Sequence, residues 1–263
     1  MTQLHAVSPS RHAEKSWSPS AGYQFAGTQT LAPLAAAEWP KALFSLPMAL
    51  HREGEAYVPV AVLGLERGHN LFVRHDGHWV GGYVPAALRS YPFRLARAPE
   101  RTEGEWVLAV DEASGLVHDG AEGRAFFDEN GKPTEEIQRL LRFLKQTHAS
   151  HLAARKAAAA LDRHGIIRPW EVAIDTPNGK HGVKGLYRVD EKAFNALEAD
   201  ALAELRDAGA LNLAYCLLYS QHRLPMLGKL MQAHQRQVPA SDDVPGNLDA
   251  FFDEDDDLEF DFE

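Results

Sequence analysis

The sequence predicts an α+β fold in which antiparallel β hairpins or a meander come first and helices follow. Three observations carry this prediction. Between residues 23 and 98, short apolar runs alternate with Pro and Gly, as in short strands joined by turns. Residues 134–164 have apolar side chains at helical spacing, over a length that strands rarely reach. A second hairpin pattern at 171–189 leads into a C-terminal helical segment.

The first half of the chain reads as short strands separated by turns. Asp76-Gly77 favours a tight hairpin turn. Pro85 suits the first position of a helical turn, because its missing N–H would have no partner there. The expected elements are strands at 57–65, 70–74, 78–80, 93–97 and 106–111 and a helical turn at 84–89.

The most regular helical pattern covers residues 134–164. Its apolar positions follow a 3.6-residue period, which places them on one face of a helix. Glu135 and Glu136 lie in the first turn, where the helix dipole favours negative charge. Gly165 suits the residue after the helix, because glycine adopts the left-handed conformation at low cost. One long central helix is therefore expected.

The C-terminal part continues with a hairpin and shorter helices. Asn178-Gly179 is the dipeptide most typical of a two-residue hairpin turn. Asp190 is expected to cap the next helix through its side-chain oxygen. The expected elements are strands at 171–176 and 183–189 and helices at 191–197, 200–208 and 211–222, the last ending near Pro225.

The net charge of −10 is concentrated at the C-terminal end. Eleven of the 37 acidic residues lie in 242–263, which has no Lys or Arg. The rest of the chain has 26 acidic and 27 basic residues and is nearly neutral. Because nucleic-acid-binding domains carry a basic patch, no nucleic-acid partner is expected.

These patterns divide the chain into three parts. Residues 1–22 are rich in Ser, Pro and Ala and are expected to form a flexible N-terminal arm. Residues 23–236 are expected to form the α+β domain. Residues 237–263 are expected to be a disordered acidic tail, because such a segment cannot bury enough apolar surface to fold.

The sequence favours a soluble, cytoplasmic protein. The N-terminal residues are not followed by the apolar stretch of a secretory signal. The most apolar stretch, 208–219, is interrupted by Asn212 and is shorter than the about 20 residues that span a bilayer. The single cysteine, Cys216, fits a reducing compartment. Delivery to the cell surface by a non-classical route is the alternative.

One cluster of residues has the chemistry of a binding site. Arg89, Tyr91 and Phe93 surround a proline-constrained corner, and Arg and Tyr are favoured anchors for a peptide or a carboxylate. Arg188 and Asp190, at the end of the second hairpin, are expected to contribute to the same surface. The alternative is structural, with the arginine stacked on a tyrosine and paired with an acid.

Asp111 and Glu112 follow an expected strand, which is a common place for site residues. Two carboxylates can act as acid and base where their surroundings separate their pKa values. The alternative, which the sequence favours, is that Asp111 caps a turn through a bond to the backbone. No catalytic residue and no cofactor is assigned, because the sequence has no G-x-S-x-G, G-x-G-x-x-G or P-loop motif.

Two groups of histidines are candidate metal ligands. His148 and His151 lie three residues apart on the expected long helix, and His69, His75 and His78 surround a turn. Zinc needs further ligands beyond such a pair, and the H-E-x-x-H pattern is not present. With 13 histidines in the chain, chance clusters are common, so no metal site is assigned.

The tail alternates acids with aromatic side chains. Phe251, Phe252, Phe260 and Phe262 could anchor it in a basic, grooved partner. A protein partner is therefore expected to dock on this segment. A tail that only adds solubility and a C-terminal export signal are the alternatives.

Several phrases in collinear order resemble the bacterial SapC family, whose name comes from an association with a surface layer. They cover roughly 24–232, and the resemblance implies a protein of similar length with no established reaction or cofactor. It also implies an accessory role, because members accompany outer-membrane uptake and tailoring-enzyme genes. The long N-terminal arm, the His148–His151 pair and the acidic tail depart from the family pattern. The phrases are PLAAAEWP (33–40), VAVLGLERGHNLFV (60–73), YVPAALRSYPFRLA (83–96), VDEAS (110–114), FFDENGKPTE (126–135), GLYRVDEKAFNAL (185–197) and LAELRDAGALNLAYCLLYSQ (202–221).

The leading functional hypothesis is a non-enzymatic accessory or binding protein with a recruiting tail. The first alternative is a metal-dependent or carboxylate-based enzyme acting on a peptide or sugar. The second is a surface-layer-associated or exported protein. The oligomeric state is left open.

Overall fold

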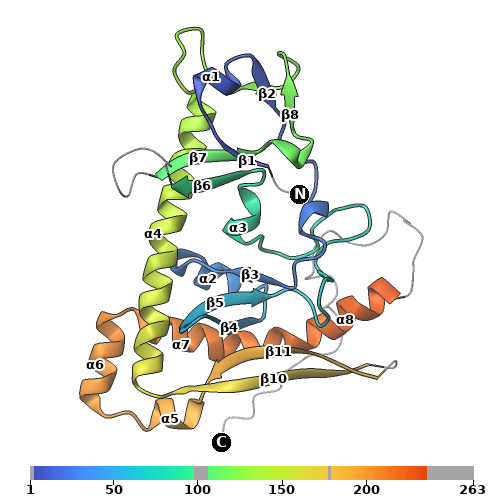
Figure 1. The fold of residues 1–263 in the computed structure, drawn as a ribbon. Helices are drawn as coiled ribbons and strands as arrows, with labels where there is room; N and C mark the ends of the chain where they lie inside the picture. Colours follow the sequence, from blue (N-terminus) through green and yellow to red (C-terminus); the bar gives the residue numbers. More distant parts are fainter. Residues whose placement is uncertain (1–2, 98–105, 177–178, 236–263) are drawn as a thin grey trace, which may run out of the picture.

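The computed structural model describes residues 3–97, 106–176 and 179–235. They form an α+β fold with antiparallel sheets, a long central helix and C-terminal helices, which confirms the predicted fold class. Figure 1 shows a five-stranded sheet and the C-terminal helices at one end of the molecule and two small sheets at the other. The long helix α4 runs along one side of both parts.

The larger sheet has five antiparallel strands in the order β10-β11-β4-β5-β3. Two hairpins supply four of these strands, and the hairpins join where Tyr187 pairs with Leu50. The predicted second hairpin is confirmed, although each of its strands begins four residues earlier than expected. The strands are β3 (Leu31–Pro33), β4 (Met48–Glu53), β5 (Ala56–Val62), β10 (Ile167–Thr176) and β11 (Gly179–Val189).

Two three-stranded sheets form the other end, in the orders β1-β7-β6 and β8-β2-β9. The predicted antiparallel pair of β6 and β7 is confirmed, with Phe93 opposite Val110. The first strand of each sheet in sequence order comes from the N-terminal segment. The strands are β1 (Leu4–Ala6), β2 (Lys15–Trp17), β6 (Phe93–Arg97), β7 (Trp106–Asp111), β8 (Val117–Asp119) and β9 (Arg124–Ala125).

Helix α4 (Glu135–Arg163) connects the two ends of the molecule. Thr134 caps it by accepting a hydrogen bond from the Ile137 N–H at 3.5 Å. Gly165 follows it at φ 64°, in the left-handed region that favours glycine. Its first half packs into one hydrophobic core through Ile137 and Leu144, and its second half packs into a larger core through five small or branched side chains. These are Ala154, Ala157, Ala158, Ala160 and Leu161.

The remaining helices are short. The predicted helical region after the second hairpin is confirmed, and Asp190 caps it by accepting a hydrogen bond from the Ala193 N–H at 3.1 Å. The helices are α1 (Pro9–His12), α2 (Trp39–Ala42), α3 (Ala86–Arg89), α5 (Glu191–Asn195), α6 (Ala199–Asp207), α7 (Ala210–Tyr219) and α8 (Leu224–Gln235). The 3₁₀ turns are η1 (Gln24–Ala26), η2 (Ala36–Glu38), η3 (Glu112–Ser114) and η4 (Ser220–Arg223).

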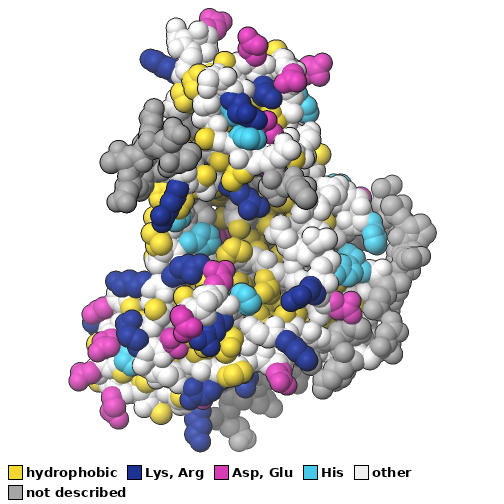
Figure 2. Space-filling view, in the orientation of Figure 1, with side chains coloured by type: hydrophobic (Ala, Val, Ile, Leu, Met, Phe, Trp, Pro, Cys, Tyr) yellow, Lys and Arg dark blue, Asp and Glu magenta, His cyan; other side chains and the backbone are white. Residues whose placement is uncertain are grey.

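Two cores hold the molecule together. The larger core lies against the five-stranded sheet, and the smaller core lies between the small sheets and the first half of α4. On the face in Figure 2, hydrophobic side chains gather between the two ends of the molecule, with Lys and Arg side chains around them. Within the described ranges, no helix is both long enough and apolar enough to cross a membrane.

The prediction of a flexible arm over 1–22 is wrong for the residues that the structure describes. Leu4 pairs with Asp111 across β1 and β7, and Trp17 pairs with Val117 across β2 and β8. Trp17 is buried in the smaller core. The segment is therefore part of the folded domain, because distant strands supply the hydrogen-bond partners that its local sequence lacks.

Two further local predictions are corrected. The strands expected at 70–74 and 78–80 are turns joined by one bridge, between Val73 and Trp79. The helical region does not end near Pro225: α8 begins at Leu224 and continues to Gln235. Pro225 lies in the first turn of α8, where proline is tolerated. The predicted tail, 237–263, lies outside the described residues.

Candidate functional site

A cleft lies between the N-terminal segment and a second segment, which comprises the end of α3 and the residues after it. Its volume is about 410 Å³, which is within the range of small-molecule pockets. One wall comes from residues 17–25 and the other from 88–93, and α4 contributes one side chain. The lining residues are Trp17, Pro19, Ser20, Ala21, Gly22, Tyr23, Phe25, Leu88, Arg89, Ser90, Tyr91, Phe93 and Leu140.

Phe25 and Tyr91 tie the two walls together. Their rings stack with centroids 3.8 Å apart and planes 7° apart. Burial raises the pKa of Tyr91, and the negative charge of Asp111 acts in the same direction. Tyr91 therefore keeps its hydroxyl proton at neutral pH and offers a ring and a hydrogen-bonding group at the cleft.

Arg89 gives the cleft its charge. Among the described residues that line the cleft, Arg89 has a charged side chain and the others are uncharged. Its guanidinium carbon lies 5.6 Å from the ring centroid of Tyr83 and 5.3 Å from that of Phe143. Its Nη2 donates a hydrogen bond to the Tyr83 hydroxyl at 3.2 Å. Arg89 forms no ion pair with an acidic residue in the described part of the chain. The side chain is thus positioned by rings and a neutral hydroxyl.

Glu38 lies behind Tyr83 and holds it in place. Oε1 of Glu38 accepts hydrogen bonds from the Tyr83 hydroxyl at 2.9 Å and from the Ala86 N–H at 2.6 Å. Oε2 accepts one from the Ala35 N–H at 2.8 Å. Burial raises the pKa of Tyr83 to about 12, with the Glu38 charge adding to the effect. The buried carboxylate is therefore satisfied, and it orients the tyrosine toward Arg89.

Asp111 has the capping role that the sequence favours. Its Oδ1 accepts hydrogen bonds from the Ala113 N–H at 3.1 Å and from the Gln3 N–H at 2.8 Å. These bonds fix the start of η3 and the N-terminal strand. Asp111 is 8% exposed and does not line the cleft.

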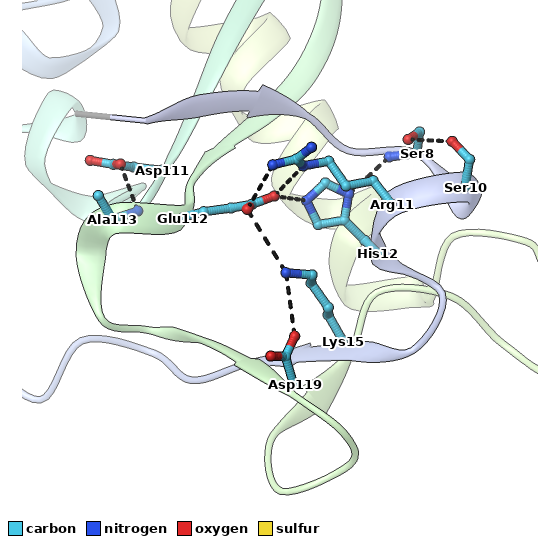
Figure 3. A network of polar contacts seen from close by, with 9 residues as sticks. All are labelled: Ser8, Ser10, Arg11, His12, Lys15, Asp111, Glu112, Ala113 and Asp119. Atoms are coloured by element: carbon cyan, nitrogen blue, oxygen red, sulfur yellow. Dashed lines mark hydrogen bonds and ion pairs between the residues drawn. The ribbon is translucent and has the colours of Figure 1, made fainter. Parts of the chain in front are cut away.

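Glu112 is the centre of a cluster of ion pairs with the N-terminal segment (Figure 3). Arg11 binds both of its carboxylate oxygens, and Lys15 Nζ lies 3.8 Å from Oε2. The hydrogen bond from Arg11 lowers the pKa of the Glu112 carboxyl, and the positive charges of Lys15 and Arg11 act in the same direction. The side chain is 12% exposed, so the carboxylate is largely enclosed by its partners.

His12 lies beside Glu112, with its Nε2 3.2 Å from Oε1. Its Nδ1 accepts a hydrogen bond from the Ser8 backbone N–H at 3.3 Å, which places the ring proton on Nε2. Burial lowers the pKa of His12. The arrangement differs from a catalytic triad, because the backbone N–H of Ser8, and not its hydroxyl, faces the imidazole.

Arg188 and Asp190 are placed by the larger sheet. Arg188 stands opposite Arg168 in the β10–β11 pair, and Asp190 caps α5. Asp190 Oδ2 also lies 3.5 Å from the Nε of Arg168. Neither residue lines the cleft with Arg89 and Tyr91, so the structure does not join the two parts of the predicted binding surface.

The two histidine groups lie in different surroundings. His148 packs against Trp106 with centroids 4.2 Å apart, and burial lowers the pKa of His151. His69 and His75 both contact His234, whose Nε2 lies 3.0 Å from the Leu71 carbonyl oxygen. In the part of the chain that the structure describes, no three His, Cys, Asp or Glu residues are arranged to hold a metal ion.

Sequence reasoning missed Phe25, Tyr83 and Glu38 as site residues. A signal for the first was available, because Trp17, Tyr23 and Phe25 place three aromatic side chains within nine residues. Glu38 carried no such signal. The tail aromatics Phe251, Phe252, Phe260 and Phe262 lie outside the described residues.

Comparison with known proteins identifies one family. The family profile SapC matches residues 7–227, and the match includes both walls of the cleft and Glu38. Comparison with curated proteins and with solved structures finds no match. Since the profile covers most of the chain, the protein belongs to the SapC family.

Proposed function

We propose that this chain is a non-enzymatic accessory protein, which binds an anionic ligand in the Arg89 cleft and recruits a protein partner through its C-terminal tail. The cleft carries the first part of the proposal. It combines one oriented guanidinium with the stacked rings of Phe25 and Tyr91. A guanidinium can bind an anion, and aromatic rings can contact the apolar part of a ligand. The two carboxylates considered for catalysis, Asp111 and Glu112, have structural partners, which supports binding over acid–base chemistry.

The tail supports the second part through its composition. Eleven acidic residues in 242–263 surround Phe251, Phe252, Phe260 and Phe262. Acidic residues steer such a segment toward a basic surface, and aromatic side chains supply anchors for a groove. The expected partner is a protein with a basic, apolar groove, and we place the complex in the cytoplasm.

Anion binding is tested by the thermal unfolding midpoint, Tm, of the full chain in a panel of carboxylates, phosphate and sulfate. At least one anion is expected to raise Tm for the wild type and for Arg67→Gln, because Arg67 is exposed and does not line the cleft. The same anion is expected to leave Arg89→Gln unchanged. Equal stabilisation of both variants would contradict a role for the cleft.

Recruitment is tested by replacing the four tail phenylalanines with alanine and leaving every acidic residue in place. The variant is expected to lose the proteins that the intact chain captures from the source cells. Phe44→Ala is the matched control, because Phe44 is 67% exposed on the folded domain. If the tail variant captures the same proteins as the intact chain, recruitment by the tail is wrong.

Cell fractionation tests the proposed cytoplasmic location. Recovery of the protein in the cell-surface fraction would contradict it.

A further inference from the structure

We infer that the ligand of the Arg89 cleft is a carboxylate joined to an aromatic ring, as in an aromatic amino acid derivative or the end of a peptide. The inference rests on the proposed function, which states only that the cleft binds an anion. It names the ligand class from the charge, the hydrogen-bonding geometry and the walls of the cleft.

The geometry of Arg89 favours a planar anion with two oxygens. One nitrogen, Nη2, donates to Tyr83, and none of the other N–H groups has a partner among the described residues. The rings of Tyr83 and Phe143 limit the movement of the guanidinium. A guanidinium held in this way can present two parallel N–H donors, which match the two oxygens of a carboxylate.

The charge of the cleft favours a carboxylate over a phosphate monoester. The described lining residues contribute one positive charge and no negative charge. A carboxylate carries one negative charge, whereas a phosphate monoester carries about 1.5 to 2 at pH 7. Part of the phosphate charge would remain uncompensated in the cleft, because the described lining residues supply one cation, and burying unpaired charge is costly.

Among the described residues, no acid forms a direct ion pair with Arg89. The Tyr83 hydroxyl donates to Glu38 and accepts from Arg89, so the contact between the two charged groups is indirect. Asp111 is close enough to influence Tyr91, but its Oδ1 is bonded to backbone N–H groups of Gln3 and Ala113. The guanidinium is therefore available to an anion from solution.

The walls of the cleft favour a ring attached to the carboxylate. The Phe25–Tyr91 stack offers aromatic surface, and Trp17 meets Phe93 edge to face with centroids 4.9 Å apart. Aromatic pairs gain attraction beyond the area they bury, in stacked or edge-to-face contact. A volume of about 410 Å³ suits a ligand of one or two residues, and a longer peptide would have to leave through the opening.

Isothermal titration of the full-length protein tests this inference with N-acetylphenylalanine as the probe. Three compounds serve as controls. N-Acetylphenylalaninamide has the ring without the carboxylate, acetate has the carboxylate without the ring, and phosphate is an anion of a different class. The acid is expected to bind about tenfold or more tightly than each of the other three. The amide lacks the charge that strengthens hydrogen bonds to a guanidinium, and acetate and phosphate lack the ring that contacts the aromatic wall. A peptide ending in phenylalanine separates the two sources, because tighter binding than the small acid indicates a peptide and equal binding a small molecule.

Variants of Arg89 connect the binding to the cleft. Arg89→Gln is expected to abolish binding of the acid, and Arg89→Lys to retain only part of it, because lysine keeps the charge without the planar fork. Arg67→Gln is expected to bind like the wild type, and circular dichroism checks that each variant is folded. If phosphate or acetate binds as tightly as the acid and still requires Arg89, the ligand class is wrong and the proposed anion site stands. If no anion binds in an Arg89-dependent way, both are wrong.

Discussion

The Tyr83 hydroxyl donates a hydrogen bond to Oε1 of Glu38 at 2.9 Å, and through this contact a buried carboxylate orients the cation of the cleft. Glu38 is 4% exposed and also binds the N–H groups of Ala35 and Ala86. It therefore joins η2, the loop before α3 and Arg89 in one hydrogen-bonded unit. Loss of one contact in such a unit affects both folding and binding.

Tyr83→Phe is expected to lower the free energy of unfolding by about 1–3 kcal/mol, because it leaves the buried Glu38 with one donor fewer. It is also expected to weaken binding of N-acetylphenylalanine, because Arg89 loses its hydroxyl acceptor. Urea denaturation and titration measure the two effects. Tyr219→Phe is the control, since Tyr219 is 57% exposed and a change there should stay within about 0.5 kcal/mol. Equal stability of both variants would show that the Glu38 contact is unimportant.

The raised pKa of Tyr83 predicts a loss of stability in alkali. In the unfolded chain a tyrosine ionises near its ordinary value of 10.0, and in the folded protein Tyr83 ionises at about 12. The stabilisation is therefore complete below pH 10 and is lost as the pH rises toward 12. Urea denaturation between pH 9 and 12 should give a steeper decline for the wild type than for Tyr83→Phe. Parallel declines would contradict the assignment.

The Glu112 cluster predicts a loss of stability in acid. The pKa of Glu112 is lowered from its ordinary value of 4.5, so its contribution is complete above that value and is lost as the pH falls through the folded value. Glu112→Gln should be less stable than the wild type at pH 7 and approach it at low pH. Glu122→Gln, an exposed substitution, should follow the wild type throughout. The pH dependence of urea denaturation distinguishes these outcomes.

Where local signals are strong, the sequence predicts the fold well. The long helix begins after Thr134 and ends before Gly165, because capping groups and a left-handed glycine mark its ends. Asp190 and Asp111 cap turns, as short polar side chains do wherever an unpaired backbone N–H is within reach. In each case the capping side chain bonds to a backbone N–H two or three residues further along the chain.

The rest depends on contacts between distant segments. Strands of three residues are too short to show a period, so β1 and β2 could not be distinguished from a loose arm. Their partners lie about a hundred residues away, at Asp111 and Val117. The site divides in the same way: Arg89 and Tyr91 are neighbours in sequence and were predicted together, whereas Phe25 reaches Tyr91 only through the tertiary fold.

Cys216 is expected to be unreactive in the native protein. It is 4% exposed on α7, and burial raises the pKa of its thiol, so little thiolate is present at neutral pH. A thiol reagent should modify it much more slowly in the native state than in denaturant. Tyr219→Cys, which adds a thiol at an exposed position on the same helix, should react fast and report that the reagent is active. Fast modification of wild-type Cys216 would indicate that α7 opens.

Phe25 gives the sharpest test of the aromatic wall. Phe25→Ala removes the ring that stacks on Tyr91, and an aromatic pair of this kind contributes about 0.5–1.5 kcal/mol beyond its buried area. Because Phe25 is half-buried, a total loss of about 1–3 kcal/mol in the free energy of unfolding is expected. Phe44→Ala makes the same change at a 67% exposed position and should stay within about 0.5 kcal/mol.

The two variants should also differ in ligand binding. Phe25→Ala is expected to weaken N-acetylphenylalanine more than acetate, because acetate has no ring to contact the wall, and Phe44→Ala should change neither. Titration at a temperature where both variants remain folded measures this difference. If Phe25→Ala loses stability but binds N-acetylphenylalanine with wild-type affinity, the stack has only a structural role and the ring of the ligand lies elsewhere.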